Sequence, residues 1–411
     1  MTKCPTETEP PIWKTDTSVL TNAVNRGQSR DVSTVLKGKD IVCFSHDWTG
    51  LPLSKTHFMR LLAKDNRILW VNSIGLRTPT LSTYDAGRIL KKLTAVATRV
   101  REVEPNIFVL NPLAIPTQKP MAKAINRRIL RFQVRSAMRA LGMRRPVNWI
   151  FNPAAAIVAR ALDEELLIYH CVDEYTAFDG VSSAALAELE HGLLRKADIV
   201  IVSAEKLYET KSAVNPRTVL VRHGVDFNHF RKALSLSTEI PREIADLPRP
   251  VIGYFGLIAT DWVDVRLLVH VARSFPDASL VMLGNVTMDV SELARLPNVR
   301  LLGRKPYETL PNYCKGFDVA LIPFPINQVT LHSNPLKARE YLAAGLPVVS
   351  TAIPEVRALP TCQVADSHDS FVAEIKNALH ERGPKAWRSD TVRAEGWDAR
   401  LEEIRQHLSR L

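Results

Sequence analysis

Cysteine is scarce in this sequence, and the few cysteines present stand far apart. None belongs to a closely spaced pair of the kind that holds zinc, and no cluster of histidine and cysteine is present. The five cysteines are Cys4, Cys43, Cys171, Cys314 and Cys362. An odd number of scattered cysteines indicates free thiols in a reducing compartment, so we expect a cytoplasmic protein. We predict no metal site and no cofactor.

Long apolar runs are also missing. No segment approaches the roughly 20 apolar residues that a membrane-spanning helix requires. Residues 1–39 are rich in threonine, serine and charge, and they lack an apolar core of signal-peptide length. We interpret residues 1–39 as a disordered leader, and the protein as soluble or peripherally bound to a membrane.

Acidic residues are absent from residues 119–145, within a chain whose net charge is +11. The basic residues there are Lys119, Lys123, Arg127, Arg128, Arg131, Arg135, Arg139, Arg144 and Arg145. Apolar residues interleave with them at mostly helical spacing, which predicts a basic amphipathic helix suited to anionic lipid on the inner face of the cell membrane. The alternative is a solvated basic face over an apolar face that packs on the protein. No pattern of a nucleic-acid-binding module accompanies the charge, so we expect no nucleic-acid partner.

Short β-rich segments alternate with helical ones along most of the chain. With 46% apolar residues, 411 residues can form two cores. Strands are expected at residues 40–45, 67–72, 147–151, 166–171, 251–256, 279–284, 299–303 and 318–324. Strand–helix–strand order predicts parallel sheets with ligands at the carboxyl ends of strands. Acidic residues follow two of these strands, namely Asp47, Asp173 and Glu174. Asp47 could instead cap the next helix, and the other two could be loop acids that contact only water.

The most informative stretch begins at Ser333. Pro335 suits the first turn of a helix, because its missing N–H would have no intrahelical partner there. Ser333 or Asn334 can cap this helix, and Gly345 is a natural stop. Residues 346–351 then have the composition of a short buried strand. On its own, this pattern also fits an ordinary amphipathic helix and strand.

The start of this predicted helix suits an anionic ligand. Its free N–H groups and its dipole attract phosphate, and Lys337 adds a positive charge in the first turn. Glu340 lies near one turn further on, where a carboxylate can accept hydrogen bonds from a ribose diol. Far upstream, Gly256 ends a strand, and a glycine there lets the backbone approach a ligand closely.

This stretch resembles the nucleotide-sugar site of GT-B glycosyltransferases, particularly the retaining enzymes of family 4 and relatives implicated in bacterial surface polysaccharides such as teichuronic acid. The resemblance covers residues 40–411, and its second half is the specific part. It implies two Rossmann-like domains with parallel sheets that face one cleft, at residues 40–235 and 251–390. A linker would occupy residues 236–250, and a helix at 391–411 would cross back to the first domain.

By the same resemblance, Glu340 is the ribose ligand. The other residues expected at the nucleotide-sugar are Gly256, Arg304, Asn334, Leu336 and Lys337. In the first domain, Asp47 is the candidate acceptor-binding residue. Asp173 or Glu174 would be catalytic, by orienting an acceptor hydroxyl or by stabilising positive charge on the donor sugar.

The sequence departs from the family's pattern at two places. Many family members have a second glutamate eight residues before the first, and here that position is His332, our third catalytic candidate. The family also places an arginine and a lysine after the strand that opens the second domain, to hold the diphosphate. Residues 261–264 read Asp-Trp-Val-Asp there, and Arg266, Arg304 or Lys337 would have to compensate.

The resemblance implies transfer of a sugar from a nucleotide diphosphate sugar to a hydroxyl of a glycan or lipid-linked acceptor, with retention and without a metal. One alternative on the same architecture is a nucleotide-sugar 2-epimerase, which needs base chemistry within one sugar. Another is a sugar-nucleotide-binding protein without catalysis, which the departures at His332 and at residues 261–264 make plausible.

Overall fold

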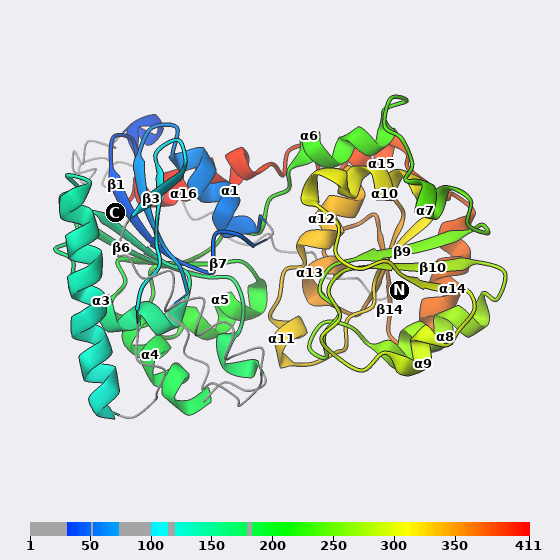
Figure 1. Cartoon of the computed structure of the whole chain (residues 1–411), viewed down its shortest axis with the longest axis horizontal. Helices are drawn as coiled ribbons and strands as arrows, with labels where there is room; N and C mark the ends of the chain where they lie inside the picture. The colour runs from blue at the N-terminus through cyan, green and yellow to red at the C-terminus, as the bar shows by residue number, and fades with distance from the viewer. Residues whose placement is uncertain (1–30, 51, 74–99, 114–119, 179–182) are drawn as a thin grey trace, which may run out of the picture.

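The computed structural model describes residues 31–50, 52–73, 100–113, 120–178 and 183–411. They form two α/β domains side by side, each built on one sheet (Figure 1). The prediction of an α/β protein with two parallel-sheet domains is therefore confirmed. Most of the predicted leader lies outside the described residues. Leu36 is buried in the core of the first domain, so this domain begins before residue 40.

The first sheet has eight strands in the order β3-β4-β2-β1-β5-β6-β7-β8. All neighbouring strands pair in parallel, except that β3 and β4 pair antiparallel. The strands are β1 (Asp40–Phe44), β2 (Arg67–Val71), β3 (Arg101–Glu104), β4 (Ile107–Leu110), β5 (Val147–Ile150), β6 (Leu166–Cys171), β7 (Ile199–Val202) and β8 (Thr218–Leu220). The helices are α1 (Ser54–Leu62), α3 (Pro120–Ala140), α4 (Ser183–Lys196) and α5 (Glu205–Ser212). Strands β5 and β7 are buried at every residue, as expected for a parallel sheet with helices on both faces.

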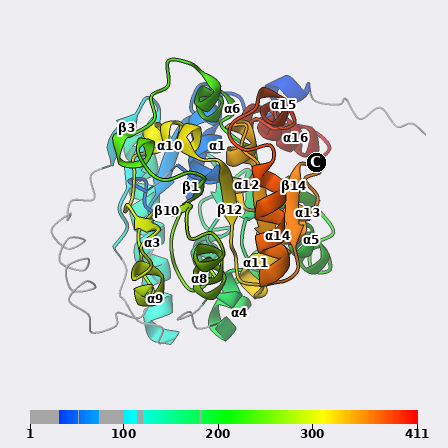
Figure 2. The same cartoon turned by 90° about the vertical axis from the view of Figure 1, so that its right-hand side faces the viewer.

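The second sheet has six parallel strands in the order β11-β10-β9-β12-β13-β14. They are β9 (Val251–Phe255), β10 (Ser279–Leu283), β11 (Val299–Leu301), β12 (Val319–Ile322), β13 (Val348–Thr351) and β14 (Cys362–Ala365). The helices from the end of the first domain onward are α6 (Phe227–Phe230), α7 (Arg242–Ala245), α8 (Val265–Ser274), α9 (Ser291–Ala294), α10 (Leu310–Gly316), α11 (Gln328–Leu331), α12 (Leu336–Ala343), α13 (Pro354–Arg357), α14 (His368–Leu379), α15 (Ala386–Asp390) and α16 (Trp397–Leu408). Helices α8 and α14 pack against each other (Figure 2).

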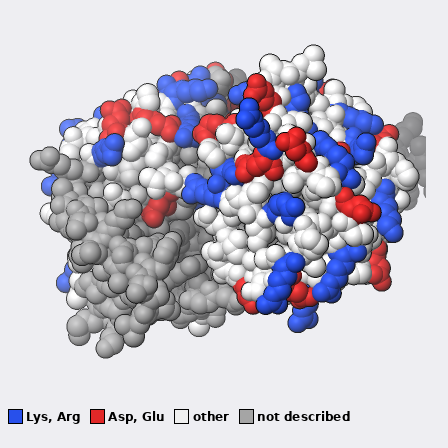
Figure 3. Space-filling view, turned by 45° about the vertical axis from the view of Figure 1, so that its right-hand side comes forward, with Lys and Arg blue, Asp and Glu red and all other residues white. Residues whose placement is uncertain are grey.

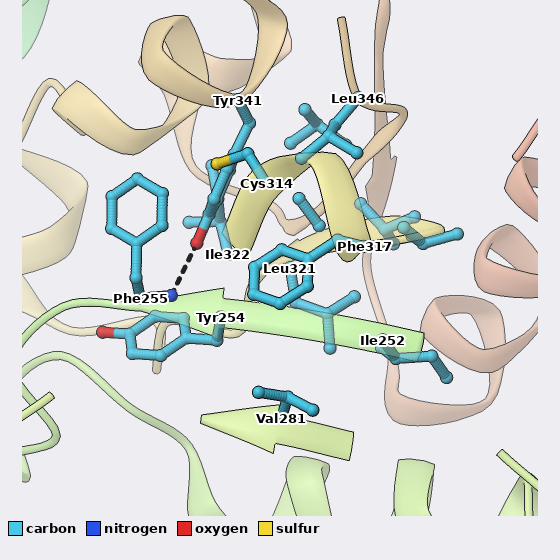
Figure 4. Packing of buried hydrophobic residues seen from close by; sticks show 14 of the residues in the cluster. Ile252, Tyr254, Phe255, Val281, Cys314, Phe317, Leu321, Ile322, Tyr341 and Leu346 are labelled. Atoms are coloured by element: carbon cyan, nitrogen blue, oxygen red, sulfur yellow. Dashed lines mark hydrogen bonds between the residues drawn. The ribbon is translucent and has the colours of Figure 1, made fainter. Parts of the chain in front are cut away.

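A buried aromatic contact fixes α12 against the central strand of the second sheet. The backbone N–H of Phe255 donates to the Tyr341 hydroxyl at 2.9 Å, and the two rings meet edge to face (Figure 4). On the same strand, a Cβ at Gly253 would lie 2.2 Å from the Phe317 ring, so only glycine allows this packing. These contacts hold the start of α12 in a fixed place at the edge of the sheet.

The last helix, α16, belongs to the core of the first domain. Its buried residues are Trp397, Leu401, Ile404 and Leu408, and they join the cluster that contains α1 and β1. The Trp397 ring stacks on His57 of α1 at a centroid distance of 5.1 Å. The chain thus crosses from the second domain back to the first (Figure 1).

Candidate functional site

A cleft of about 440 Å³ lies between the two domains, at the carboxyl ends of strands from both sheets. Its first-domain wall comes from the segment that leads into α1, the end of β6 and the segment after β8. Its second-domain wall comes from the ends of β9 to β12 and from the start of α12. Open α/β sheets bind their ligands at this end of the strands, so the cleft is the candidate site.

Helix α12 begins in the cleft without a side-chain cap. Pro335 is its N-cap residue, and the serine and asparagine before it, which we predicted as caps, make other contacts. The Ser333 hydroxyl donates to the Thr330 carbonyl at 2.9 Å. Among the described residues, the first backbone N–H groups of the helix, those of Leu336 and Lys337, have no hydrogen-bond acceptor. They are available to an anionic ligand.

The side chain of Lys337 passes directly over Gly256. A Cβ at Gly256 would lie 2.2 Å from Lys337 Cε, and the backbone there has a φ of +141°, so this position requires glycine. The Lys337 ammonium lies 5.7 Å from the centre of the Tyr254 ring and 5.4 Å from that of Phe324. Burial lowers the pKa of Lys337, and nearby Glu340 opposes the shift. The structure therefore brings two of the predicted ligands, Gly256 and Lys337, together.

Glu340 lies one helical turn after Lys337, and both residues line the cleft. The Glu340 carboxylate has no hydrogen-bond or ion-pair partner within the part of the chain that the structure describes. Burial raises the pKa of Glu340 to about 7; Lys337 opposes this shift, and the charge of Asp226 adds to it. A carboxylate with two free oxygens in a cleft suits a ligand with two adjacent hydroxyls.

Backbone from β9 and β10 meets at the floor of the cleft. A Cβ at Gly284, which follows β10, would lie 1.7 Å from the carbonyl oxygen of Gly256. Only glycine permits this approach, which brings the ends of the two strands into one surface. Arg304, which follows β11, is exposed and also lines the cleft. Its guanidinium makes no ion pair with any described residue.

The segment that replaces the family's arginine and lysine, residues 261–264, contributes only its tryptophan to the cleft wall. Trp262 lines the cleft and meets the Phe324 ring edge to face at 5.4 Å. Asp264 caps α8 by accepting from the Leu267 N–H at 2.9 Å. Arg266, a predicted substitute, does not line the cleft. Of the three predicted substitutes, the cleft contains Arg304 and Lys337.

Asn334 joins the two domains at the edge of the cleft. Its amide donates to the Ser203 carbonyl of the first domain at 2.8 Å, and its side-chain oxygen accepts from Arg339 at 2.7 Å. The backbone carbonyl of Asn334 accepts from Nδ1 of His223, a first-domain residue, at 2.8 Å. The predicted role of Asn334 as a ligand stays a prediction, but these contacts already use both ends of its side chain.

Asp173 and Glu174 point into different surroundings. Asp173 lines the cleft, and burial raises the pKa of its carboxyl while nearby Lys55 opposes the shift. Glu174 turns away and forms an ion pair with Lys211 at 2.8 Å. Burial disfavours its charge, but hydrogen bonds from Lys211 and Thr176 hold the pKa of Glu174 below its usual value. Of this pair, Asp173 is placed to meet a ligand.

Two further candidates lie outside the cleft lining. The His332 ring follows α11, and its Nδ1 is hydrogen-bonded to the Gln328 carbonyl at 2.8 Å. Asp47 has one carboxylate oxygen that is buried without a partner among the described residues. Neither residue belongs to the cleft lining, so their roles toward the donor sugar and the acceptor stay predictions.

Sequence reasoning missed Lys55. This lysine is the second residue of α1, it is 9% exposed, and it lines the first-domain wall of the cleft. Its position in the sequence could have identified it. Lys55 is in the first turn of the helix that follows the first strand, just as Lys337 is in the first turn of α12.

The described residues contain no group of three or more His, Cys, Asp and Glu side chains arranged to hold a metal. Within those same residues, no helix has both the length and the apolar character to cross a bilayer.

Known proteins resemble this chain in sequence and in fold. Residues 249–381 match the family model of glycosyl transferases group 1. The chain is thus similar in sequence to the group 1 glycosyl transferases over most of its second domain. It is 25% identical over 288 residues, 63% of this chain and 70% of the relative, to the protein named "Putative teichuronic acid biosynthesis glycosyltransferase TuaH" from Bacillus subtilis.

Solved structures share the two-domain fold over nearly the whole chain. Sucrose-phosphate synthase from Thermosynechococcus elongatus superposes with a TM-score of 0.66 at 16% identity, covering 90% of this chain and 98% of that one. HepE from Anabaena, solved in complex with UDP-glucose, gives 0.60 at 13% identity, covering 91% and 100%. These superpositions establish the two-domain GT-B fold of the chain, and the predicted resemblance is confirmed.

Proposed function

We propose that the protein transfers a sugar, with a hexose as first candidate, from a nucleotide diphosphate sugar to a hydroxyl acceptor, with retention and without a metal ion. The observation that carries the proposal is the placement of Lys337 and Glu340 one turn apart, on a helix that begins in the cleft. This helix offers N–H groups and a positive charge to a diphosphate, and a carboxylate to a ribose diol.

The nucleotide would lie along the second-domain wall. Glu340 accepts hydrogen bonds from the two ribose hydroxyls, and Gly256 and Gly284 allow the ligand to approach the backbone closely. Lys337, Arg304 and the N–H groups at the start of α12 contact the diphosphate. Because negative charge builds up on the diphosphate as it leaves, these groups stabilise the transition state more than the ground state.

The acceptor would enter from the first domain, where Asp173 faces the cleft. Its carboxylate orients the acceptor hydroxyl or stabilises positive charge on the donor sugar. Glu174 acts through its ion pair with Lys211, which fixes the turn that follows β6. It is a positioning residue in this proposal, and Asp173 is the residue that touches the substrate.

The names of relatives suggest the substrates. HepE was solved with UDP-glucose, which makes UDP-sugars the first donors to test. TuaH is named for teichuronic acid biosynthesis, which supports a glycan or lipid-linked acceptor in bacterial surface polysaccharide synthesis.

A lipid-linked acceptor would require contact with a membrane, and α3 offers a suitable surface. Its buried face, which includes Leu130 and Val134, packs on the first domain's core, as the alternative interpretation expected. Its outer face still presents basic side chains, and Phe132 is 68% exposed among them. By contrast, basic and acidic side chains are interspersed on the face of the second domain in Figure 3. We propose that the outer face of α3 lies on anionic lipid in the cytoplasm.

The first experiment is a thermal-shift screen with UDP, GDP and dTDP. A ligand that binds only the native state stabilises it by about 2.7 kcal/mol at a concentration of 100 times its Kd. Stabilisation by one of the three identifies the base. If none of the three raises the unfolding temperature, the proposal is wrong.

The second experiment incubates the protein with labelled UDP-glucose, or the matching donor, and a bacterial membrane extract. Label transferred to lipid or glycan supports the proposal. Isomerised donor would identify a 2-epimerase instead, and tight binding without turnover would identify a binding protein.

A further inference from the structure

Lys55 is a buried cation without a counterion in direct contact. It is 9% exposed, and it makes no ion pair with a described residue within 4.0 Å. Among the described residues, its ammonium donates one hydrogen bond, to the Tyr175 hydroxyl at 3.3 Å, and it lies 5.9 Å from the centres of the Phe151 and Tyr175 rings. An ammonium has three N–H donors, so two of them lack a partner among these residues.

This environment disfavours the charge of Lys55. Removal of an ammonium from water is costly unless an anion and hydrogen bonds replace the water. Burial lowers the pKa of Lys55, and the nearby carboxylate of Asp173 opposes this without fully compensating. A methionine or leucine would fill the same space without this cost. The desolvation cost of the Lys55 ammonium is offset if an anionic ligand in the cleft supplies the missing negative charge.

The place of Lys55 matches that of Lys337 on the opposite wall. Each is the second residue of a helix that begins in the cleft, and neither helix has a side-chain cap. Each ammonium lies over aromatic rings, and each is near a cleft carboxylate, Asp173 or Glu340. The two lysines thus present positive charge to one cleft from two domains.

The second domain alone provides few cations for a diphosphate. The segment after β9, residues 261–264, contributes Trp262 to the wall and no basic residue. Arg304 is exposed at the rim, and Lys305 also lines the cleft but pairs with Glu243 at 2.7 Å. Lys337 is therefore the enclosed cleft-lining cation of this domain that has no ion pair among the described residues. A buried lysine on the first-domain wall would supply what this segment lacks.

We propose that Lys55 binds the diphosphate of the donor from the first-domain side, opposite Lys337. This inference rests on the proposed function. When the bond from the anomeric carbon to a β-phosphate oxygen breaks, its electron pair stays on that oxygen. The acceptor oxygen forms the new bond, and its proton passes to the departing diphosphate. Lys55 donates a hydrogen bond to this diphosphate while its charge increases.

The test compares the affinities of UDP and uridine for four proteins by calorimetry. These are the wild type, Lys55→Met, Lys337→Met and Lys64→Met, the last a control at an exposed lysine just beyond the end of α1. Lys55→Met should weaken UDP binding about tenfold to a hundredfold, as expected for loss of a charge-assisted hydrogen bond. Uridine affinity should stay unchanged, because uridine has no phosphate. Lys64→Met should match the wild type for both ligands.

The uridine measurement separates a phosphate contact from a structural role, because a distorted cleft would weaken both ligands equally. Lys55→Gln is made in parallel, so that a folding defect in one variant leaves the test intact. Equal UDP affinity of the wild type and a folded Lys55 variant would overturn the inference while the proposed function stands, provided that Lys337→Met weakens UDP. If the wild type binds no nucleoside diphosphate, the proposed function fails first.

Discussion

The carboxylate of Glu355, in the second domain, accepts a hydrogen bond of 2.8 Å from the backbone N–H of Glu205, at the start of α5 in the first domain. Helix α5 has no side-chain cap of its own, so the other domain supplies this acceptor. The second oxygen of Glu355 accepts from Arg222 at 2.8 Å, and Glu355 is 3% exposed. A buried polar contact therefore joins the domains near the cleft.

Replacing Glu355 with alanine should destabilise the protein. The change leaves the Glu205 N–H and the Arg222 guanidinium without their acceptor, and loss of a cap together with a buried charge-assisted bond costs at least about 2 kcal/mol. The unfolding temperature should fall by several degrees in a thermal melt. The control is Glu209→Ala, which removes an exposed ion pair with Lys206 on α5. Equal melting of the two variants would show that the contact contributes little.

Glu340→Ala should weaken nucleotide binding. Two hydrogen bonds from ribose hydroxyls to a carboxylate would be lost, and bonds of this kind contribute roughly 1.5–3 kcal/mol each. Affinity for the nucleotide selected by the screen should fall at least about tenfold, as measured by calorimetry. Glu292→Ala, on the surface of the same domain, is the control. Unchanged affinity in a folded Glu340→Ala protein would remove this residue from the site.

Binding of uridine should strengthen as the pH rises from 6 to 8. Burial raises the pKa of Glu340 to about 7, so part of the free protein carries a protonated carboxyl below that pH. The ionised form is the better acceptor for two hydroxyl donors. Uridine is used because it has no phosphate that titrates in this range. Glu340→Gln should bind uridine more weakly and with no pH dependence, and parallel pH profiles for the two proteins would contradict the assignment.

The same pKa predicts a pH dependence of stability. A carboxyl with a normal pKa of 4.5 when unfolded and about 7 when folded binds an extra proton in the native state between these values. The free energy of unfolding therefore falls as the pH rises through that range. Without nucleotide, Glu340→Gln should melt at a higher temperature than the wild type at pH 8, and the difference should shrink at pH 5. A constant difference at both pH values would exclude this role.

The outer face of α3 should bind anionic membranes. Replacing Arg127, Arg128 and Arg131 with glutamine and Phe132 with serine should abolish flotation with anionic liposomes at low salt. Each basic residue near such a surface contributes about 1 kcal/mol, and Phe132, the aromatic residue of this helix, is 68% exposed.

A matched control keeps the same net charge but leaves α3 intact. It replaces three exposed basic residues elsewhere, Lys64, Lys376 and Arg410, with glutamine. This variant should float like the wild type. Loss of flotation in both variants would mean that net charge, and not α3, governs the association.

The core of the candidate site was predictable because its signals are local. A helix start, a lysine in the first turn and Glu340 one turn later fall within a few residues of each other, and the family resemblance adds their roles. Contacts between distant segments were not predictable in this way. Asn334 bonds to Ser203, 131 residues away, and this contact decides where its side chain points.

The burial of Lys55 could not be predicted from the sequence either. A helix that begins with Ser-Lys gives no sign that its lysine will be enclosed by Phe151 and Tyr175, which follow two other strands. Asp173 and Glu174 are adjacent in the sequence after β6. Only packing decides that one faces the cleft while the other pairs with Lys211.

The return of α16 to the first domain sets an order for folding during synthesis. Trp397, which packs edge to face on Phe58 at 5.3 Å, leaves the ribosome after the whole second domain has been made. The amino-terminal domain therefore cannot complete its core first, although it is translated first, and the usual domain-by-domain sequence is inverted. Until α16 has been synthesised, the apolar surface around α1 stays exposed. We expect chaperones to bind the nascent chain at this surface.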